Sequence, residues 1–259
     1  MTASIKLDFV IDKDYLIAHT FSREASQRGF SSGENAEDIF ALQARALSLS
    51  ERYSHLVKIS PEEVIGNPFN LWASEELSDA VVALKRTAEY QNILAQTQKY
   101  KRRIELEWDA NLERSSRFMR DLTGLPLDKT YTVFVTHPSL HNGMYLGNRR
   151  IAWGGSPDFE NYDTVYLWHE VLHDAEHVGT DGSVGHAIIE LVTDNGLRVH
   201  LNGSDGERLI GHSNLDRIRR ELHNYDWPGY LASDRNIRAF KAEMEKKYRF
   251  ALPLLNDEY

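Results

Sequence analysis

Residues 163–202 read DTVYLWHEVLHDAEHVGTDGSVGHAIIELVTDNGLRVHLN, and we expect the rest of the chain to be arranged around this stretch. Residues 169–173 within it read HEVLH, which is an H-E-x-x-H motif. On a helix, residues four apart lie above one another on the same face. The imidazoles of His169 and His173 are therefore spaced to bind one metal ion, with the carboxyl group of Glu170 beside it.

The residues around the motif predict two helices joined by a loop. Asp163 is a suitable N-cap, and apolar side chains recur at helical spacing after it. These side chains are Val165, Trp168, Leu172, Ala175 and Val178. A glycine-containing loop follows at residues 179–182, and Ser183 is placed to cap a second helix. The apolar face of that helix would consist of Val184, Ile188, Leu191 and Val192.

The second helix carries two acidic residues one turn apart, Glu190 and Asp194. A zinc site with two histidine ligands needs a third protein ligand and an open position for water. We expect Glu190 to be the third ligand and Asp194 to accept the free ring N–H of His169 or His173. His186, one turn before Glu190, is interpreted first as an ordinary helix-face histidine, then as a substrate contact, and last as a replacement ligand.

H-E-x-x-H followed by E-x-x-x-D on a second helix resembles the gluzincin, or thermolysin-like, zinc metallopeptidases, over about residues 131–201. In that family the two histidines and the later Glu bind zinc, the first Glu activates water, and the Asp orients a ligand histidine. The resemblance implies that His169, His173 and Glu190 bind zinc. It also implies that Glu170 activates water and that Asp194 orients a ligand histidine. The chain differs from the family in having Ile189, where thermolysin-like enzymes have Asn before the Glu.

The resemblance also implies that the chain is an enzyme, a zinc metallopeptidase with one zinc ion per chain and a peptide or protein substrate. Such an enzyme needs a hydrogen-bond donor for the transition-state oxyanion in addition to the metal. Tyr230 and His223 are candidates because they follow the metal helices, as are Tyr225 and His212. For each of them a structural or capping role is favoured over the contact with substrate. His177 is expected to lie outside the ligand set, because it is about 12 Å along the helix from His169.

Composition limits the remaining function classes. The chain has 259 residues, a formal net charge of −9 and no cysteine. The acidic balance argues against the phosphate backbone of a nucleic acid as a partner, and the lack of cysteine excludes thiolate zinc ligands and a cysteine nucleophile. Neither a signal peptide nor an apolar run of membrane-spanning length is visible, so we expect no membrane partner and a cytoplasmic location. The oligomeric state is left open.

The predicted fold class is α+β and mainly helical. Residues 1–124 are expected to form a mainly helical N-terminal region, with a strand at residues 5–11 and a helix capped by Asp12 or Asp14 that ends near Gly29. Further helices are predicted from Ala36 to about residue 56 and from Ser60. Residues 75–123 contain neither Gly nor Pro. They predict either one helix of about 70 Å or two antiparallel helices with a turn at residues 91–101.

Residues 125–203 are expected to form a zincin-like catalytic core of a short mixed sheet and the two metal-site helices. Strands are predicted at residues 132–136, 144–147 and 150–153. In gluzincins a strand like the last one is a sheet edge that pairs with substrate, and the alternative for residues 150–153 is an ordinary buried strand. Residues 204–259 are expected to form a helical segment that closes the cleft. It would contain a helix at 213–223, a loop at 223–230, and a helix that starts at Asp234 or Asn236.

Two other functions are compatible with the sequence. A non-catalytic helical interaction protein, in which a structural metal only joins two helices, fits the long helical region before Gly124. A ferritin-like di-iron protein would use Glu170 and His173 as an E-x-x-H motif, but the sequence contains no second such motif. The peptidase interpretation uses more of the residues in the 163–202 stretch.

Overall fold

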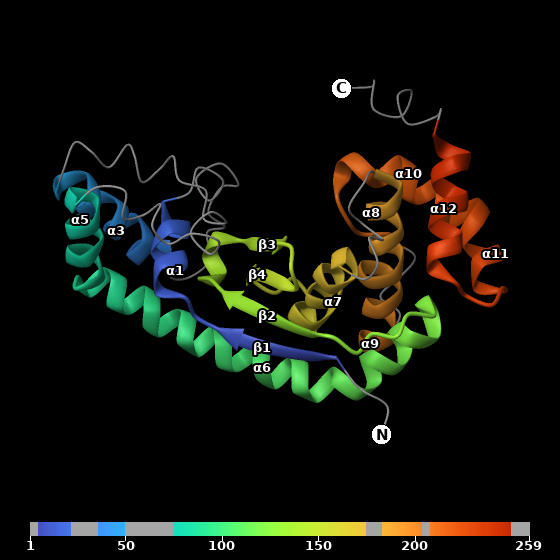
Figure 1. Cartoon of the computed structure of the whole chain (residues 1–259), viewed down its shortest axis with the longest axis horizontal. Helices are drawn as coiled ribbons and strands as arrows, with labels where there is room; N and C mark the ends of the chain where they lie inside the picture. The colour runs from blue at the N-terminus through green and yellow to red at the C-terminus, as the bar shows by residue number, and fades with distance from the viewer. Residues whose placement is uncertain (1–4, 22–35, 50–74, 175–182, 204–207, 250–259) are drawn as a thin grey trace.

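A computed structural model describes residues 5–21, 36–49, 75–174, 183–203 and 208–249 of the chain. The described residues form many helices and a four-stranded mixed sheet, which confirms the predicted mainly helical α+β class. Figure 1 shows helix α6 (Ala88–Thr123) running beneath the sheet along the length of the molecule. Helices from the N-terminal part of the chain gather at one end of α6, and those from the C-terminal part gather at the other.

The sheet has the spatial order β1 (Lys6–Val10), β2 (Thr130–Val135), β4 (Arg150–Gly154), β3 (Asn142–Tyr145). β1 and β4 run parallel to β2, and β3 runs antiparallel to β4. Residues 150–153 are therefore not a sheet edge, and the alternative of an ordinary buried strand is confirmed. Ile151 and Ala152 are both fully buried, as expected for a strand that is covered on both faces. The edge strand on this side of the sheet is β3.

A small hydrophobic cluster is formed by helices α1 (Lys13–Thr20), α3 (Ala36–Leu49) and α5 (Glu75–Lys85) and the start of α6. Asp12 caps α1 by accepting the backbone N–H groups of Asp14 and Tyr15 at 2.9 and 2.8 Å. Helix α3 buries Ile39, Leu42 and Ala46, which recur at helical spacing. This cluster also includes Leu16, Leu84 and Ile93, and it is separate from the main core.

The segment without Gly or Pro divides near its start and not in its middle. Helix α5 (Glu75–Lys85) ends before Thr87, whose hydroxyl accepts the N–H of Tyr90 and caps α6. α6 then continues for 36 residues, about 54 Å, so the turn expected at residues 91–101 is absent. Its buried face runs through that region without interruption. Gly124 ends the helix in the left-handed conformation, at φ 70°, as its position in the sequence predicted.

The stretch at 163–202 forms the two predicted helical segments. Helix α7 (Tyr162–Asp174) carries the H-E-x-x-H motif. Helix α8 (Ser183–Glu190) continues directly into a π-helical stretch, Leu191–Leu197, and then into α9 (Arg198–Asn202). In a π-helix the hydrogen bond spans one more residue than in an α-helix, so side chains four apart no longer lie directly above one another. Asp194 is inside this stretch, and its direction relative to Glu190 changes accordingly.

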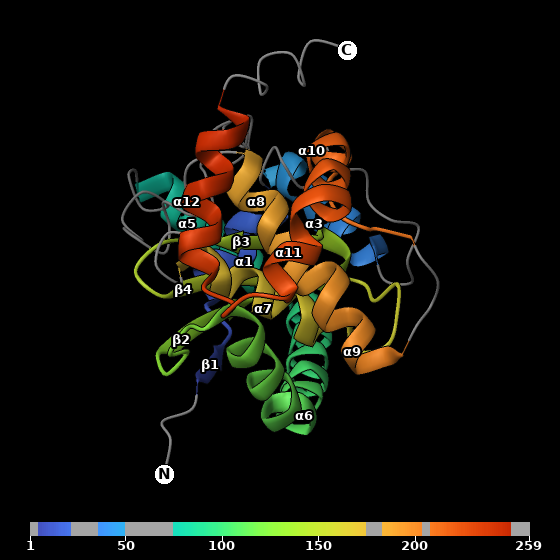
Figure 2. The same cartoon turned by 90° about the vertical axis from the view of Figure 1, so that its right-hand side faces the viewer.

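The C-terminal part is more helical than predicted. After a short 3₁₀ turn, α10 (Asp216–Glu221) leads into a π-helical stretch, Leu222–Asp226, and then α11 (Trp227–Leu231). The expected loop at residues 223–230 is thus wrong, because the rings of Trp227 and Tyr230 pack on Phe240 and bury this segment. Asn236 caps α12 (Ile237–Tyr248), as predicted. In the end-on view of Figure 2, α10, α11 and α12 lie on the near side, above α6.

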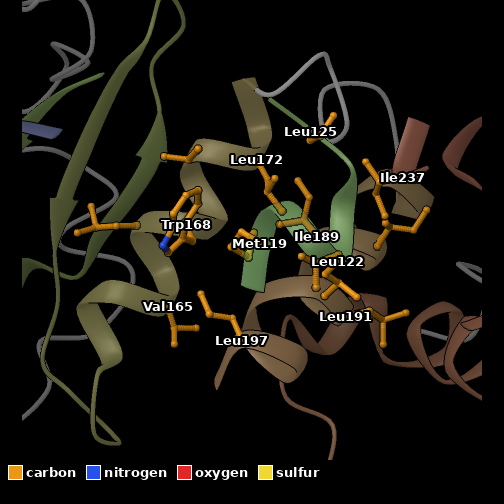
Figure 3. Close-up of a cluster of buried hydrophobic side chains, with 14 of the residues drawn as sticks. Met119, Leu122, Leu125, Val165, Trp168, Leu172, Ile189, Leu191, Leu197 and Ile237 are labelled. Carbon is orange, nitrogen blue, oxygen red and sulfur yellow. The ribbon is translucent and has the colours of Figure 1, made fainter. Parts of the chain in front are cut away.

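One main hydrophobic core connects these parts. It includes side chains from β1, α6, the sheet, α7, α8, the π-helical stretch and the C-terminal helices. Figure 3 shows its centre, where Trp168 and Leu172 of α7 meet Met119 and Leu122 of α6 and Ile189 of α8. The motif helix is therefore fixed on its apolar side, and the histidines project from the remaining side.

Several expectations lie outside the described residues. They are the helix end near Gly29, the helix start at Ser60, His177, and the glycine-containing loop at 179–182. Within the described part of the chain, none of the helices is both long enough and apolar enough to span a membrane.

Candidate metal centre

The start of α7 is held by a buried carboxylate. Asp163 was predicted to be the N-cap, but it lies within the first turn, and its side chain turns away from the helix end. Its Oδ1 accepts the hydroxyl of Tyr100 at 2.7 Å and the indole N–H of Trp153 at 2.8 Å, and Oδ2 pairs with Arg103 at 2.9 Å. These contacts join α6, β4 and α7, so they fix the helix that presents the H-E-x-x-H side chains.

His169 and His173 lie on one face of α7, as their spacing predicted, with ring centroids 5.1 Å apart. His186 from α8 completes a group of three imidazoles whose candidate ligand nitrogens all lie within 4.8 Å of one another. The Nε2 atoms of His169 and His186 are 3.1 Å apart. The rings of His173 and His186 are 4.9 Å apart and nearly perpendicular. His169 is buried, whereas His173 and His186 are partly exposed.

Asp194 lies where the sequence predicted, against His169. Its Oδ1 is 2.8 Å from His169 Nδ1 and also accepts the hydroxyl of Thr193 at 2.8 Å. An ionised carboxylate only accepts hydrogen bonds, so Nδ1 of His169 carries a proton and Nε2 is the ring nitrogen left to bind a metal ion. Burial lowers the pKa of His169, but the charge of Asp194 outweighs burial and the pKa is raised to about 9.

Glu170 lies on the side of α7 that faces the edge strand β3. The residue is 6% exposed, and burial raises the pKa of its carboxyl group to about 7, against the opposing effects of His169, His212 and a hydrogen bond from the backbone of Tyr145. Gly143 of β3 lies beside this carboxyl group: a Cβ atom there would be 3.5 Å from Glu170 Oε1 but only 2.9 Å from the ring of Trp153, so the glycine makes room for that ring. A carboxyl group with a pKa near neutrality can both accept and return a proton.

Glu190 is fully buried and has different neighbours from those predicted. Its Oε2 forms an ion pair with the guanidinium group of Arg219, which is also buried. Its Oε1 accepts the backbone N–H of His212 and contacts the ring Nδ1 of His212, each at 2.7 Å. The structure therefore groups Glu190 with His186 and His212, and not with the pair His169 and His173.

The segment that brings His212 to this position is attached to the π-helical stretch. The side chain of Asn195 donates to the carbonyl oxygens of Glu190 and Ile210 at 2.7 and 3.0 Å, and it accepts the N–H of Ile210 at 2.8 Å. Gly211 passes so close to Glu190 that a side chain at this position would overlap its carboxylate. His212 is the most exposed member of the histidine group, with 58% of its side chain accessible.

The two proposed oxyanion donors are placed differently from each other. Tyr230 is buried, and its hydroxyl donates to the carbonyl oxygen of Leu122, which is the structural role favoured for it. His223 lies on the surface, where its ring contacts Asn224, and it lines a cavity of about 920 Å³ with Arg208, Gly211 and Arg219 among others. Arg219 was missed in the sequence because nothing local marks it: it contacts Glu190 from 29 residues away.

The donor atoms suit a zinc-type metal ion. Imidazole nitrogen and carboxylate oxygen are common zinc ligands, and imidazole also binds cobalt, nickel and copper. Burial and the positive charges of neighbouring histidines lower the pKa of His186 to about 3, so its ring is neutral and able to act as a ligand. The hydrogen bond from His169 to Asp194 is the outer contact that a ligand histidine usually makes.

Comparison with known proteins adds no further information. A scan against protein-family models found no match, and searches of curated proteins and of solved structures found no significant match. Functional inference therefore depends on the residues and their geometry.

Proposed function

We propose that the chain is a metal-dependent hydrolase of peptide bonds, with zinc as the metal and Glu170 as the general base. One observation carries the proposal. Glu170, the residue after His169 on α7, has a buried carboxyl group beside the two paired imidazoles, and the ring nitrogen of His169 that faces away from the metal group is bonded to Asp194. A helix whose only purpose was to bind a structural metal would gain nothing from burying Glu170 beside the ligands.

The chemistry requires a Lewis acid and a base. When bound, zinc would polarise the scissile carbonyl group and acidify water. Glu170 accepts the proton of the attacking water and returns it to the leaving amine nitrogen. Asp194 keeps His169 in the tautomer whose Nε2 faces the metal group.

A peptide substrate is supported by the position of β3. This strand is antiparallel to β4, and in the described part of the chain it has no partner strand on its other side. An extended peptide can add to such an edge through its backbone. Because the backbone of Tyr145 in β3 bonds to Glu170, a peptide paired with β3 would run beside the proposed base.

The test compares wild type with Glu170→Gln, which keeps the size of the side chain but removes the base. Zinc per chain is measured by mass spectrometry, and cleavage is measured on a mixed peptide library. We expect cleavage to fall by at least about a hundredfold at unchanged zinc content. Glu160→Gln, at an exposed glutamate just before α7, is the matched control and should cleave like wild type.

Equal cleavage by wild type and Glu170→Gln would show that Glu170 is not the base. The alternative function is a non-catalytic helical interaction protein with a structural metal. Wild-type protein with a full complement of zinc and no cleavage of any library peptide would favour that alternative.

A further inference from the structure

The two histidines of the H-E-x-x-H motif need a third protein ligand, and two side chains compete for this role. His186 and Glu190 are one turn apart on α8. The sequence favours Glu190, because it stands in an E-x-x-x-D pattern. The contacts that each of the two side chains makes in the folded protein point to the opposite choice.

The position of His186 fits a ligand of the ion that His169 and His173 would hold. With Zn–N bonds of about 2.0–2.1 Å in a tetrahedral site, two ligand nitrogens lie about 3.3–3.4 Å apart. The observed separation of His169 Nε2 and His186 Nε2 is 3.1 Å. Because Nδ1 of His169 is bonded to Asp194, it is Nε2 that faces His186 and would bind the metal. His173 lies within reach of both rings, at centroid distances of 5.1 and 4.9 Å.

The position of Glu190 does not fit the same role. Both of its carboxylate oxygens already have strong partners. Oε2 pairs with Arg219, and Oε1 contacts the backbone N–H and the ring Nδ1 of His212. Its Oε1 is 4.0 Å from His186 Nε2, and Glu190 is not grouped with His169 and His173. The buried guanidinium group of Arg219 beside it would repel a metal cation. If the carboxylate of Glu190 moved away from Arg219 to bind a metal, the guanidinium group would stay buried without this partner, which is strongly unfavourable.

The second group that the structure forms, His186 with Glu190 and His212, is a weaker metal site for the same reason. The 2.7 Å contact between His212 Nδ1 and Glu190 Oε1 is a hydrogen bond, and a metal ion would have to replace its proton. Arg219 neutralises the only carboxylate in that group. Between His169 and His186 a metal ion would also have to replace a shared proton, but the guanidinium group of Arg219 is bonded to Glu190 and not to these rings.

We propose that the metal is held by three imidazoles, those of His169, His173 and His186, and that Glu190 is a positioning residue. This inference shares with the proposed function the assumption that a metal is bound, and it does not depend on peptide cleavage. The ligand set is neutral, so the bound ion keeps its full charge of two. Glu190 instead holds the segment 208–212 and α10 against α8 and orients the ring of His212, which lies next to His186 at a centroid distance of 4.7 Å.

The test measures metal affinity and needs no substrate. Metal-free wild type, His186→Ala and Glu190→Gln are each titrated with Zn²⁺ against a chromophoric chelator. We expect His186→Ala to lose at least about a hundredfold in zinc affinity, because loss of a ligand exceeds the usual loss of an outer contact. Glu190→Gln should stay within about threefold of wild type, since the amide occupies the same volume.

Two further measurements keep the result interpretable. Cobalt(II) is added to each protein, and the visible absorption bands, which report the ligand set, should match wild type in Glu190→Gln and differ in His186→Ala. If Glu190→Gln does not fold, the paired variant Glu190→Gln with Arg219→Met removes both members of the buried pair and is titrated in its place.

The outcomes separate the two proposals. Wild-type zinc affinity in a folded His186→Ala, or a large loss of affinity in a folded Glu190→Gln, would overturn the three-imidazole centre while leaving the metal site itself in place. If wild type does not bind zinc or cobalt, the metal centre and the proposed function fail together. Strong binding that disappears only in His186→Ala supports the three-imidazole centre, whatever the cleavage assay shows.

Discussion

Because Glu190 and Arg219 form a buried ion pair, we expect the loss of either partner to lower the free energy of unfolding, whether or not a metal is bound. The side chains of both residues are almost entirely buried, at 0% and 3% exposure. Replacing Glu190 by Ala leaves the guanidinium group in place with only Asp216, at 2.9 Å, and the carbonyl oxygen of His212, at 3.2 Å. Removal of one partner from a buried pair typically destabilises by about 3–5 kcal/mol.

The remaining contacts of Arg219 set the expected size of the effect. Because Asp216 is still available, the loss should be near the lower limit of that range, about 3 kcal/mol. The backbone N–H of His212 also loses its acceptor, but it lies near solvent, so this adds no more than about 1 kcal/mol. For a chain of this length, a loss of about 3–4 kcal/mol corresponds to a decrease in Tm of roughly 6–16 °C.

The assay is urea unfolding followed by circular dichroism, with a chelator present so that bound metal does not contribute to stability. Wild type, Glu190→Ala, Arg219→Met and the double variant form a double-mutant cycle. The double variant should be less destabilised than the sum of the single variants, because it leaves no unpaired buried charge. A loss below about 1 kcal/mol in Glu190→Ala, or effects that simply add, would refute the inference that this pair fixes α10 to α8.

Two other predictions concern Asp194 and His137. Asp194→Asn should weaken zinc binding by roughly tenfold to a hundredfold without removing the site, and a competitive zinc titration measures this. Direct coordination of the metal by Asp194 in a metal-bound structure would contradict its role as the hydrogen-bond partner of His169. Burial lowers the pKa of His137 from 6.5 to about 4. The neutral, buried ring of His137 therefore contributes fully to folding stability above pH 6.5, and this contribution is lost as the pH falls towards 4. The shift in pKa corresponds to a loss of up to about 3 kcal/mol. Urea unfolding at several pH values should show that His137→Gln removes this part of the acid sensitivity, whereas an identical pH dependence in the variant would exclude it.

Features determined by local spacing could be predicted from the sequence. The pairing of His169 with His173 follows from helical periodicity alone. The strands β1, β2 and β4 follow from short runs of apolar and β-branched residues, and the end of α6 follows from Gly124. The strand predicted at residues 144–147 lies two residues earlier, as β3 at Asn142–Tyr145. The contact between Asp194 and His169 was also predicted, because a carboxylate after the second motif histidine is the usual partner of a ligand's ring N–H.

Features determined by distant partners could not be predicted. The neighbours of Glu190 depend on Arg219 and on the π-helical stretch, and neither has a recognisable sequence pattern. Tyr230 resembled a substrate contact by residue type, but the carbonyl oxygen that it binds belongs to Leu122, more than a hundred residues earlier. The order of the strands likewise depends on which strand pairs with β2, and the periodicity of residues 150–153 is the same for an edge and a central strand.

The parallel pairing of β1 with β2 has a consequence for how the protein is made. Lys6 lies opposite Thr130, so β1 leaves the ribosome about 120 residues before its partner exists. At about 5–20 residues per second, the first strand waits roughly 6–24 seconds for β2 to be synthesised. An unpaired strand is a template for association with other chains during such an interval. Lys6 and Asp8 place opposite charges on the exposed face of β1, and we expect them to keep the newly made strand in solution until the sheet can form.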